Sequence, residues 1–328
     1  MPDLRIGVIG CGAMARDLAR RCIALGARIT AVSDPDPQAL AKGVSELGAE
    51  GTEDYETLCC RPDVDAVIVG SPPGNHLENV LAAARARKPV YCEKPLGINV
   101  AQCDQMIAAC KDAGVSLFVG QVLRLFPLFW QSRVLIDQGK IGTPKAVSVT
   151  RAGYGSVFHS GWRKRKDLAG GLLLEVNAHE FDYMRFLLGE PTQVYAKLDN
   201  ILGGMEYEDQ AFVTVSFESG AAGMLHSTFS SPLGEYRVHI QGTEGNIIHG
   251  GFGGTLRYKR VDGEEGEFRP EDVNVPNPYD RELASWIASL TAGETPLFTG
   301  QDGRAAVAMA EAAYRSAERD RPVAIAEL

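Results

Sequence analysis

The pattern of apolar and polar residues changes near residue 120. Up to that point, short apolar runs alternate with stretches in which apolar residues recur at helical spacing. This pattern predicts strands at residues 4–9, 28–33, 66–70, 89–92 and 115–119, and helices at 13–25, 36–47, 76–87 and 100–113. Such alternation is typical of an α/β domain with a parallel, doubly wound sheet covered by helices on both faces. Residues 66–69 are apolar at every position, as expected for a strand buried on both sides.

Beyond Gln121 apolar and polar residues alternate with a period of two residues. Residues 211–217 and 236–241 alternate apolar with polar or small side chains, which predicts antiparallel strands with two different faces. Helices are predicted at residues 127–138, 172–188, 279–291 and 301–319, and a glycine-rich loop at 250–254. We therefore expect two domains, residues 1–121 and 122–328. The second is an α+β domain with a mostly antiparallel, open-faced sheet, whose uncovered face would be apolar enough to pair with another subunit.

The composition of the 328 residues is that of an ordinary globular protein, with 45% hydrophobic and 23% charged residues. A net charge of -9 argues against a broad nucleic-acid surface, which needs a basic face. Nothing is expected to span a membrane, because no apolar run is long enough, and the early first strand leaves no room for a signal peptide. The seven cysteines form no recognisable framework, so we expect free thiols and a cytoplasmic location.

The turn after the first strand carries a dinucleotide-binding pattern. Residues 10–15, Gly-Cys-Gly-Ala-Met-Ala, have the form G-x-G-x-x-A between a strand and a helix, which is the context that a Rossmann domain requires. Gly10 permits the tight turn, Gly12 lets the backbone approach a pyrophosphate, and Ala15 is small enough for the helix to pack close to the strand. Ala13 and Met14 begin the helix, where free N–H groups and the helix dipole attract negative charge.

An acidic residue follows the second predicted strand. Asp34 stands about twenty residues after the glycines, where a carboxylate can accept hydrogen bonds from the adenosine ribose. It would repel a 2′-phosphate, which favours NAD over NADP. NADP stays an alternative, since Arg28 and Ser33 lie nearby in the sequence. Asp34 could instead belong to a turn that caps the next helix.

Further candidates follow the third and fourth predicted strands of this domain, at the edge where ligands bind. Ser71, Pro73 and His76 are expected along the nicotinamide half of the cofactor, although His76 could merely cap a helix. Glu93 and Lys94 directly follow the strand 89–92 and are also expected at the cofactor. Lys94 can donate a hydrogen bond to a substrate oxygen there. The alternative is an ordinary surface lysine in a strand–loop turn.

The second domain carries a candidate acid–base pair. Glu175 and His179 are four residues apart on one predicted helix, so both project from one face. A histidine can accept a hydroxyl proton, and a carboxylate can orient it. The alternative for His179 is a core histidine bonded to a backbone carbonyl. The second histidine of a zinc-binding helix is missing, so we expect no metal site.

A further set of residues, with weaker support from the sequence, could contact the substrate. Arg124 follows the last strand of the first domain, Tyr154, His159 and Trp162 precede the Gly170-Gly171 turn, and Asn177 lies between Glu175 and His179. Aromatic and hydrogen-bonding side chains together suit a polyol, which has apolar ring faces and many hydroxyls. Trp162 could equally be a core residue and His159 a surface residue. The basic run 163–166 is interpreted as a solvated loop, although one of its members, such as Arg163, could instead contact the substrate.

With these residues assembled, nearly the whole chain resembles the glucose-fructose oxidoreductase / inositol dehydrogenase / MocA family. The resemblance rests on the glycine turn, Ser71-Pro72-Pro73 with His76, Glu93-Lys94-Pro95, Arg124-x-Phe126-Pro127, the Gly170-Gly171 turn with His179 and Asp182, and Thr299-Gly300-x-Asp302-Gly303. It implies a Rossmann domain joined to an open-faced sheet, NAD or NADP as cofactor, sugars or cyclitols as substrates, and homodimers or homotetramers built through the sheet.

The resemblance also implies roles for single residues. Lys94 matches the family's catalytic lysine and His179 its catalytic histidine. Family members commonly carry Asp four residues before that histidine and Gly two residues before it, where this chain has Glu175 and Asn177. The departure indicates a subgroup with its own substrate.

The sequence therefore predicts an NAD(P)-dependent oxidoreductase that moves a hydride between nicotinamide and a ring CH–OH of a sugar, sugar derivative or cyclitol. Two alternatives stay open. One is an NAD-dependent glycosidase or lyase that oxidises its substrate transiently, and the other is a non-catalytic dinucleotide-binding regulator.

Overall fold

The computed structural model describes residues 4–154 and 161–328, which form two compact units. The first unit takes in the chain up to Gln121 together with Tyr279–Arg304, and the second takes in Val122–Pro278 and Ala305–Leu328. The sequence pattern assigned everything after residue 121 to the second domain. The return of residues 279–304 to the first unit is therefore a difference from that expectation, and its cause lies in packing described below.

The first unit is built on a parallel sheet of six strands. The strands are β1 (Arg5–Ile9), β2 (Arg28–Ser33), β3 (Glu50–Thr52), β4 (Ala66–Val69), β5 (Val90–Cys92) and β6 (Leu117–Val119). Their order is β3-β2-β1-β4-β5-β6 and every neighbouring pair is parallel. This is the doubly wound arrangement of the Rossmann fold, with its switch point between β1 and β4. The predicted parallel sheet is confirmed, and β3 is the strand that the pattern missed.

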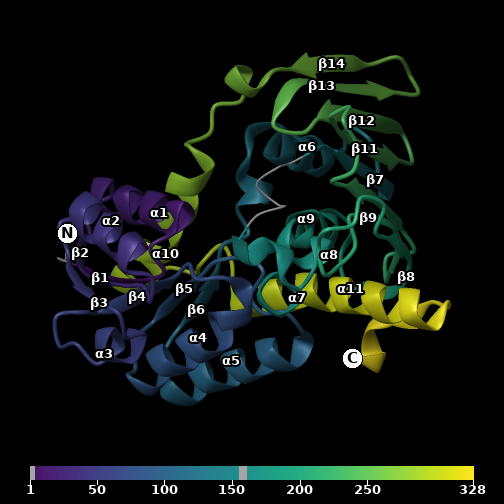
Figure 1. Cartoon of the computed structure of the whole chain (residues 1–328). Helices are drawn as coiled ribbons and strands as arrows, with labels where there is room; N and C mark the ends of the chain where they lie inside the picture. The colour runs from purple at the N-terminus through teal and green to yellow at the C-terminus, as the bar shows by residue number, and fades with distance from the viewer. Residues whose placement is uncertain (1–3, 155–160) are drawn as a thin grey trace. The chain divides into compact units, whose positions relative to one another are not determined.

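Helices lie on both faces of this sheet (Figure 1). They are α1 (Ala13–Ala24), α2 (Pro37–Leu47), α3 (Tyr55–Cys59), α4 (His76–Arg85), α5 (Val100–Ala113) and α10 (Pro278–Thr291). Side chains at the N-caps of α2, α3 and α5 (Asp36, Asp54 and Asn99) accept hydrogen bonds from backbone N–H groups of the first turn. Gly48 and Gly114 end α2 and α5 in the left-handed conformation.

Aromatic packing explains why residues 279–304 join the first unit. Trp286 of α10 is fully buried, and its ring meets that of Tyr91 on β5 edge-on at 5.5 Å between centroids. The Tyr91 hydroxyl donates a hydrogen bond to Glu282 Oε2 at 2.9 Å. Phe298 packs edge-on against Phe118 of β6, with centroids 5.7 Å apart. These long-range contacts are not visible in the local sequence pattern.

The second unit is built on a sheet of nine strands. They are β7 (Pro144–Ala152), β8 (Pro191–Asp199), β9 (Gln210–Phe217), β10 (Ala222–Thr228), β11 (Glu235–Gly242), β12 (Gly245–Gly250), β13 (Gly253–Arg260), β14 (Glu265–Phe268) and β15 (Val323–Ala324). The order is β14-β13-β12-β11-β7-β10-β9-β8-β15. Among the described strands of this second sheet, only β7 and β10 pair in parallel, which confirms the prediction of a mostly antiparallel sheet. The predicted glycine-rich loop is a tight turn in the structure, because β12 extends to Gly250 and β13 begins at Gly253.

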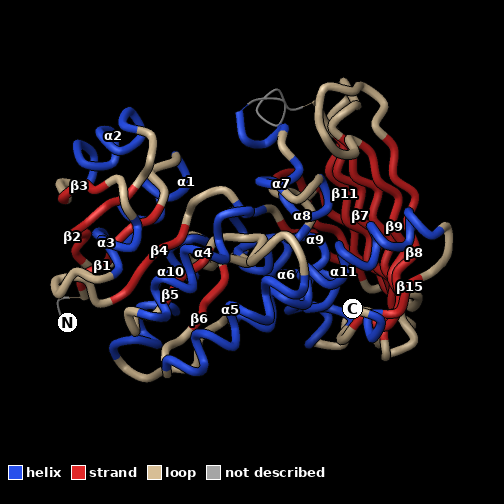
Figure 2. The backbone as a smooth tube through the Cα atoms, turned by 60° about the horizontal axis from the view of Figure 1, so that its bottom comes forward, coloured by secondary structure: helices blue, strands red, loops and turns tan. Residues whose placement is uncertain are grey.

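Helices gather on one side of this sheet (Figure 2). They are α6 (Pro127–Asp137), α7 (Lys166–Ala169), α8 (Leu172–Glu175), α9 (Ala178–Leu188) and α11 (Gly300–Arg319). Val213 of β9 and Leu225 of β10 are buried, whereas Phe212 and Met224 on the same strands are 49% and 48% exposed. The period-two pattern thus separates a covered face from an open face, as expected. No helix of the described residues has the length and apolarity needed to cross a bilayer.

The contact between Tyr91 and Glu282 yields a test of the fold. Tyr91→Phe removes a donor from a fully buried carboxyl group. We expect the free energy of unfolding to fall by about 1–3 kcal/mol, because a buried polar atom loses a hydrogen bond. Urea unfolding checks this, with Tyr55→Phe, which alters a half-buried tyrosine on α3, as the control. Equal stability of the two variants would contradict the structural importance of this contact.

Candidate functional site

The turn between β1 and α1 has the conformation that its glycines permit. Gly10 has φ +89°, and its N–H donates to Ser33 O at 2.8 Å. A Cβ at Gly10 would lie 2.7 Å from the backbone nitrogen of Ser71, so only glycine fits against the end of β4. The turn that carries the fingerprint is therefore pressed against the loop that carries Ser71.

The first turn of α1 is open to a ligand. Gly12, Ala13 and Met14 are exposed, and a Cβ at Gly12 would meet nothing within 4 Å. The N-cap residue of this helix makes no side-chain hydrogen bond, whereas the N-cap side chains of α2, α3 and α5 do. The first turn of α1 also holds no acidic residue. The unsatisfied N–H groups and the positive end of the dipole suit an anionic group such as a pyrophosphate. The residues of this turn therefore fit NAD.

Ala15 holds α1 close to the sheet. It is fully buried, and a Cβ added to Gly70 at the end of β4 would lie 2.7 Å from the Ala15 Cβ. Two small residues thus face each other where helix and strand are nearest. A larger side chain at either position would push the helix N-terminus away from the strand ends.

Asp34 is part of the same turn. One of its carboxylate oxygens accepts a hydrogen bond from Cys11 N at 2.7 Å, and the other accepts from Asp36 N at 2.9 Å. Each oxygen keeps further acceptor capacity, since a carboxylate oxygen can take more than one donor. Asp34 is half-buried, so it can both shape the glycine turn and face a ribose hydroxyl.

His76 lies between two backbone loops. It is fully buried, its Nε2 lies 2.9 Å from Ser71 O, and its Nδ1 lies 3.0 Å from Pro95 O. Burial lowers the pKa of His76 below its ordinary value. The neutral ring has one N–H and can donate to one of these carbonyls, and the buried ring lies between the Ser71 loop and the Pro95 loop. Pro73, the other residue expected along the cofactor, is buried beside it at the start of a short 3-10 turn.

Glu93 and Lys94 follow β5 at the same edge of the sheet as Ser71. Both are half-buried, and Lys94 N donates to Glu93 Oε2 at 3.1 Å. The Lys94-Pro95 peptide bond is cis. Through Pro95 the lysine loop is held by His76, which in turn holds the Ser71 loop. The first unit thus gathers Gly10, Ser71, Glu93 and Lys94 at the carboxyl ends of its central strands.

In the second unit, the predicted helix 172–188 is broken into α8 and α9. Asn177 at the break has φ -95° and ψ 2°, and its N–H bonds back to Leu172 O at 3.3 Å. Glu175 ends α8 and His179 lies in the first turn of α9, half-buried. The assumption of one continuous helix through both residues was therefore wrong.

Glu175 is paired with an arginine that the sequence interpretation left in a solvated loop. Its Oε1 accepts a hydrogen bond from Arg163 Nε at 2.8 Å, and Glu175 is 6% exposed. The Arg163 guanidinium also lies over the ring of Trp162, 4.3 Å from the centroid. Arg163 and Trp162 thus form a half-buried cluster with Glu175, near the helix that carries His179.

Glu180 is a buried acidic residue that sequence reasoning missed. It is fully buried and accepts hydrogen bonds from Arg151 of β7, Tyr236 of β11 and Asn177. The helix N-terminus that carries His179 is thereby fastened to the sheet. Neither arginine's partner could be found from spacing, because each pair joins segments far apart in the sequence.

Arg124, which the sequence predicts to contact substrate, forms a buried ion pair in this structure. Its guanidinium makes two hydrogen bonds to the fully buried carboxylate of Asp182, one of them from Nε to Oδ2 at 2.6 Å. Its charge is therefore used inside the unit, where it ties the segment after residue 121 to α9. Among the other candidates, Tyr154 is 63% exposed and His159 lies outside the described residues.

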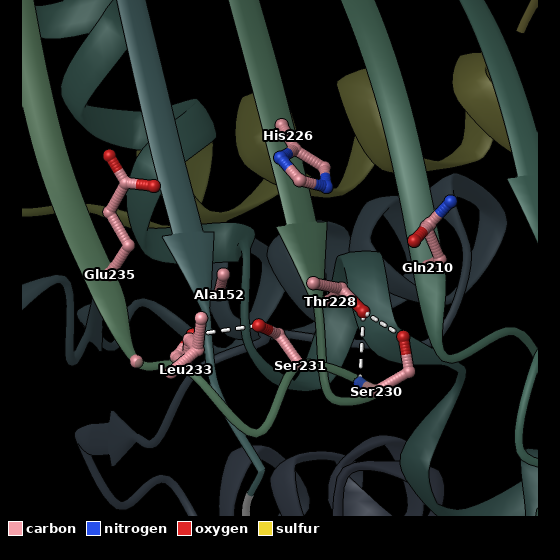
Figure 3. Close-up of a pocket in the computed structure, with 9 residues that line it drawn as sticks. Ala152, Gln210, His226, Thr228, Ser230, Ser231, Leu233 and Glu235 are labelled. Carbon is pink, nitrogen blue, oxygen red and sulfur yellow. Dashed lines mark hydrogen bonds between the residues drawn. The ribbon is translucent and has the colours of Figure 1, made fainter.

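A cavity of about 620 Å³ lies on the open face of the second sheet (Figure 3). Its lining is mostly polar and comprises Ala152, Gln210, His226, Thr228, Ser230, Ser231, Leu233, Gly234 and Glu235. None of the residues expected at the active site lines it. Across the described ranges 4–154 and 161–328, no three His, Cys, Asp or Glu side chains gather in a way that could hold a metal ion.

Two family models match this chain. Residues 4–121 match the NAD-binding Rossmann fold of the Gfo/Idh/MocA oxidoreductase family, and residues 133–325 match its C-terminal alpha/beta domain. Together the two matches cover most of the sequence.

Relatives span the full length as well. The chain is 31% identical to myo-inositol 2-dehydrogenase of Thermotoga maritima, with 99% of each chain covered. It is 31% identical to 2,7-anhydro-N-acetylneuraminate hydratase of Mediterraneibacter gnavus, with 100% of this chain and 98% of that protein covered. A solved structure of a probable dehydrogenase from Thermotoga maritima has a TM-score of 0.82 and 30% identity, covering 99% of this chain and 100% of that one. The chain belongs to the Gfo/Idh/MocA oxidoreductase family.

Proposed function

We propose that this protein is an NAD-dependent dehydrogenase that acts on a ring CH–OH of a sugar, sugar derivative or cyclitol. The observation that carries the proposal is the uncapped, exposed glycine turn at the edge of the sheet that also carries Lys94. Family membership supports the redox class, and the relative named myo-inositol 2-dehydrogenase supports a cyclic polyol as substrate. Asp34 supports NAD over NADP.

The residues divide the chemistry between them. NAD, when bound, supplies the acceptor for the hydride that leaves the CH–OH carbon. In this proposal His179 accepts the hydroxyl proton, while Lys94 donates a hydrogen bond to the same oxygen as it becomes a carbonyl. Glu175, paired with Arg163, positions the segment before His179. Asn177, Trp162 and Tyr154 remain the proposed substrate contacts.

A second candidate is a reaction with transient oxidation and no net redox change. The relative named 2,7-anhydro-N-acetylneuraminate hydratase favours it, because a hydratase has no net redox change. One experiment separates the two functions: incubation with NAD and a panel of cyclitols, aldoses and anhydrosugars. Accumulation of reduced nicotinamide supports the dehydrogenase. Product without reduced nicotinamide supports the second candidate, and cofactor binding without any product would favour a non-catalytic regulator.

The open face of the second sheet is the proposed site of homodimer or homotetramer formation. Phe212 and Met224 expose about half of their surface there, 49% and 48% respectively, although they lie mid-strand in β9 and β10. The Phe212 ring stacks on His226 at 4.3 Å, which gives a flat platform. Large apolar side chains exposed on a sheet face are a common feature of subunit contacts.

A cytoplasmic location is proposed from the cysteines. All seven are free thiols, and six of them are buried. Burial raises the pKa of Cys22 to about 12 and that of Cys110 to about 11, which keeps both thiols unreactive.

Gly12→Val tests the cofactor site without disturbing the fold. A Cβ at Gly12 meets nothing within 4 Å, so we expect normal thermal stability. The branched side chain would fill the space proposed for the pyrophosphate, so the Kd for NAD should rise by at least about tenfold. Fluorescence titration with NADH measures this. Gly253→Val, at another glycine with open space, is the control, and unchanged NADH binding by Gly12→Val would contradict the proposed site.

Lys94→Ala tests the proposed catalytic lysine. Turnover of the polyol should fall by about a hundredfold or more, since the hydrogen bond to the reacting oxygen is lost. NADH binding should be retained, because the glycine turn is intact. Steady-state kinetics and NADH titration measure the two effects, and Lys111→Ala, an exposed lysine at the end of α5, is the control. Full activity of Lys94→Ala would remove this lysine from the mechanism.

Met224→Glu tests the proposed subunit contact. A charge in the middle of the open face should shift the protein from oligomer to monomer, as light scattering after size exclusion would show. Val261→Glu is the control, because Val261 is 83% exposed at the turn that follows β13. An oligomer that survives Met224→Glu, or a monomeric wild type, would contradict this interface.

A further inference from the structure

Asn177 is unusual among the residues around His179. It is fully buried at the N-cap of α9, two residues before the histidine. Its Nδ2 donates a hydrogen bond to Glu180 Oε2 at 3.0 Å. Its Oδ1 is also buried, and within the described part of the chain no donor reaches it. One half of this amide is thus satisfied and the other half is not.

Glu180 determines which end of the Asn177 amide is turned toward it. Its Oε1 accepts hydrogen bonds from Arg151 Nη1 at 2.7 Å and Tyr236 OH at 2.6 Å. Burial and the neighbouring Glu180 raise the pKa of Tyr236 well above its ordinary value, so its hydroxyl stays protonated and continues to donate. With the positive Arg151 beside it, the Glu180 carboxylate acts only as an acceptor. Asn177 must therefore turn its NH₂ group toward Glu180 and its oxygen away.

A buried acceptor without a donor destabilises a folded protein, and an apolar side chain of similar size would avoid that penalty. Such groups are commonly retained where a ligand supplies the missing partner. Asn177 meets this description next to the residue proposed to take the substrate proton. The sequence resemblance places glycine at this position in related proteins, so the amide is a feature of this chain.

Building on the proposed function, we propose that Asn177 Oδ1 accepts a hydrogen bond from a hydroxyl of a neutral polyol substrate. Glu180, held by Arg151 and Tyr236, is the positioning residue that keeps the amide in this orientation. A sugar acid with its carboxylate at this point would set an acceptor against an acceptor, so the neutral polyol is preferred. Because Oδ1 is enclosed in this structure, ligand binding rearranges the side chains around it.

The test compares stability with substrate affinity. Asn177→Leu removes the Oδ1 acceptor and also the Nδ2 donor to Glu180. Because the buried Glu180 carboxylate loses one hydrogen bond, we expect a lower thermal midpoint, together with an unchanged Kd for NADH and a Kd for myo-inositol or D-glucose raised by about tenfold or more. Isothermal titration calorimetry of the NADH-loaded protein measures the affinities, with Asn246→Leu, at an exposed asparagine on β12, as the control.

A second variant keeps the proposal falsifiable if Asn177→Leu fails to fold. Glu180→Gln can donate as well as accept, so it releases the Asn177 amide from its fixed orientation. Weaker polyol binding with unchanged NADH binding is expected. Polyol affinity unchanged in whichever of the two variants folds would overturn the proposal, as would wild-type protein that binds D-glucuronate more tightly than D-glucose.

The outcomes also separate this proposal from the function on which it rests. Wild-type protein that binds NADH but none of the polyols would contradict both. Wild-type protein that binds a polyol, together with variants that bind it equally well, would contradict only the role of Asn177.

Discussion

The close approach of α1 to the switch point between β1 and β4 is the constraint on which the first unit depends. It is possible because Ala15 faces Gly70 and because Gly10 has no side chain to collide with Ser71. This packing brings the exposed first turn of α1 beside the strand ends. From Ser71 the contact continues through buried His76 to Pro95, next to Lys94. The turn that suits a pyrophosphate and the loop that carries the lysine are therefore parts of one packed assembly.

The second unit uses buried ion pairs for a similar purpose. Arg163 with Glu175, Arg151 with Glu180, and Arg124 with Asp182 each bring a basic residue to the short segment around His179. A buried carboxylate is tolerated only where a partner compensates its charge, so these pairs fix the segment in place. The break between α8 and α9 lies between Glu175 and Glu180, whose arginine partners stand on different elements.

The sequence allowed most of the fold to be predicted, and the reasons for the omissions are physical. Strands such as residues 66–69 were recognised because a strand covered on both faces is apolar throughout. The strand β3 was missed because it is three residues long and mostly exposed. The return of α10 to the first unit rests on contacts such as Trp286 with Tyr91, which no local pattern reveals.

The candidate site was also predicted incompletely, because local sequence does not reveal the partners of a side chain. A polar residue at a strand end can serve a ligand or its own fold, and the sequence cannot distinguish the two uses. His76 and Arg124 were assigned to ligands because their types and positions suited them, and the structure gives both of them partners inside the protein. The pairing of Arg163 with Glu175 and the role of Glu180 were overlooked because the partners are distant in the sequence. Lys94 and His179 remain predictions that chemistry must test.

The most direct measurement follows the hydride itself. A cyclic polyol deuterated at the reacting carbon is incubated with NAD and the protein, and the nicotinamide is then examined by nuclear magnetic resonance. The account predicts that oxidised polyol accumulates together with reduced cofactor that carries deuterium at C4. Oxidised polyol that accumulates while the reduced cofactor stays free of deuterium would contradict it.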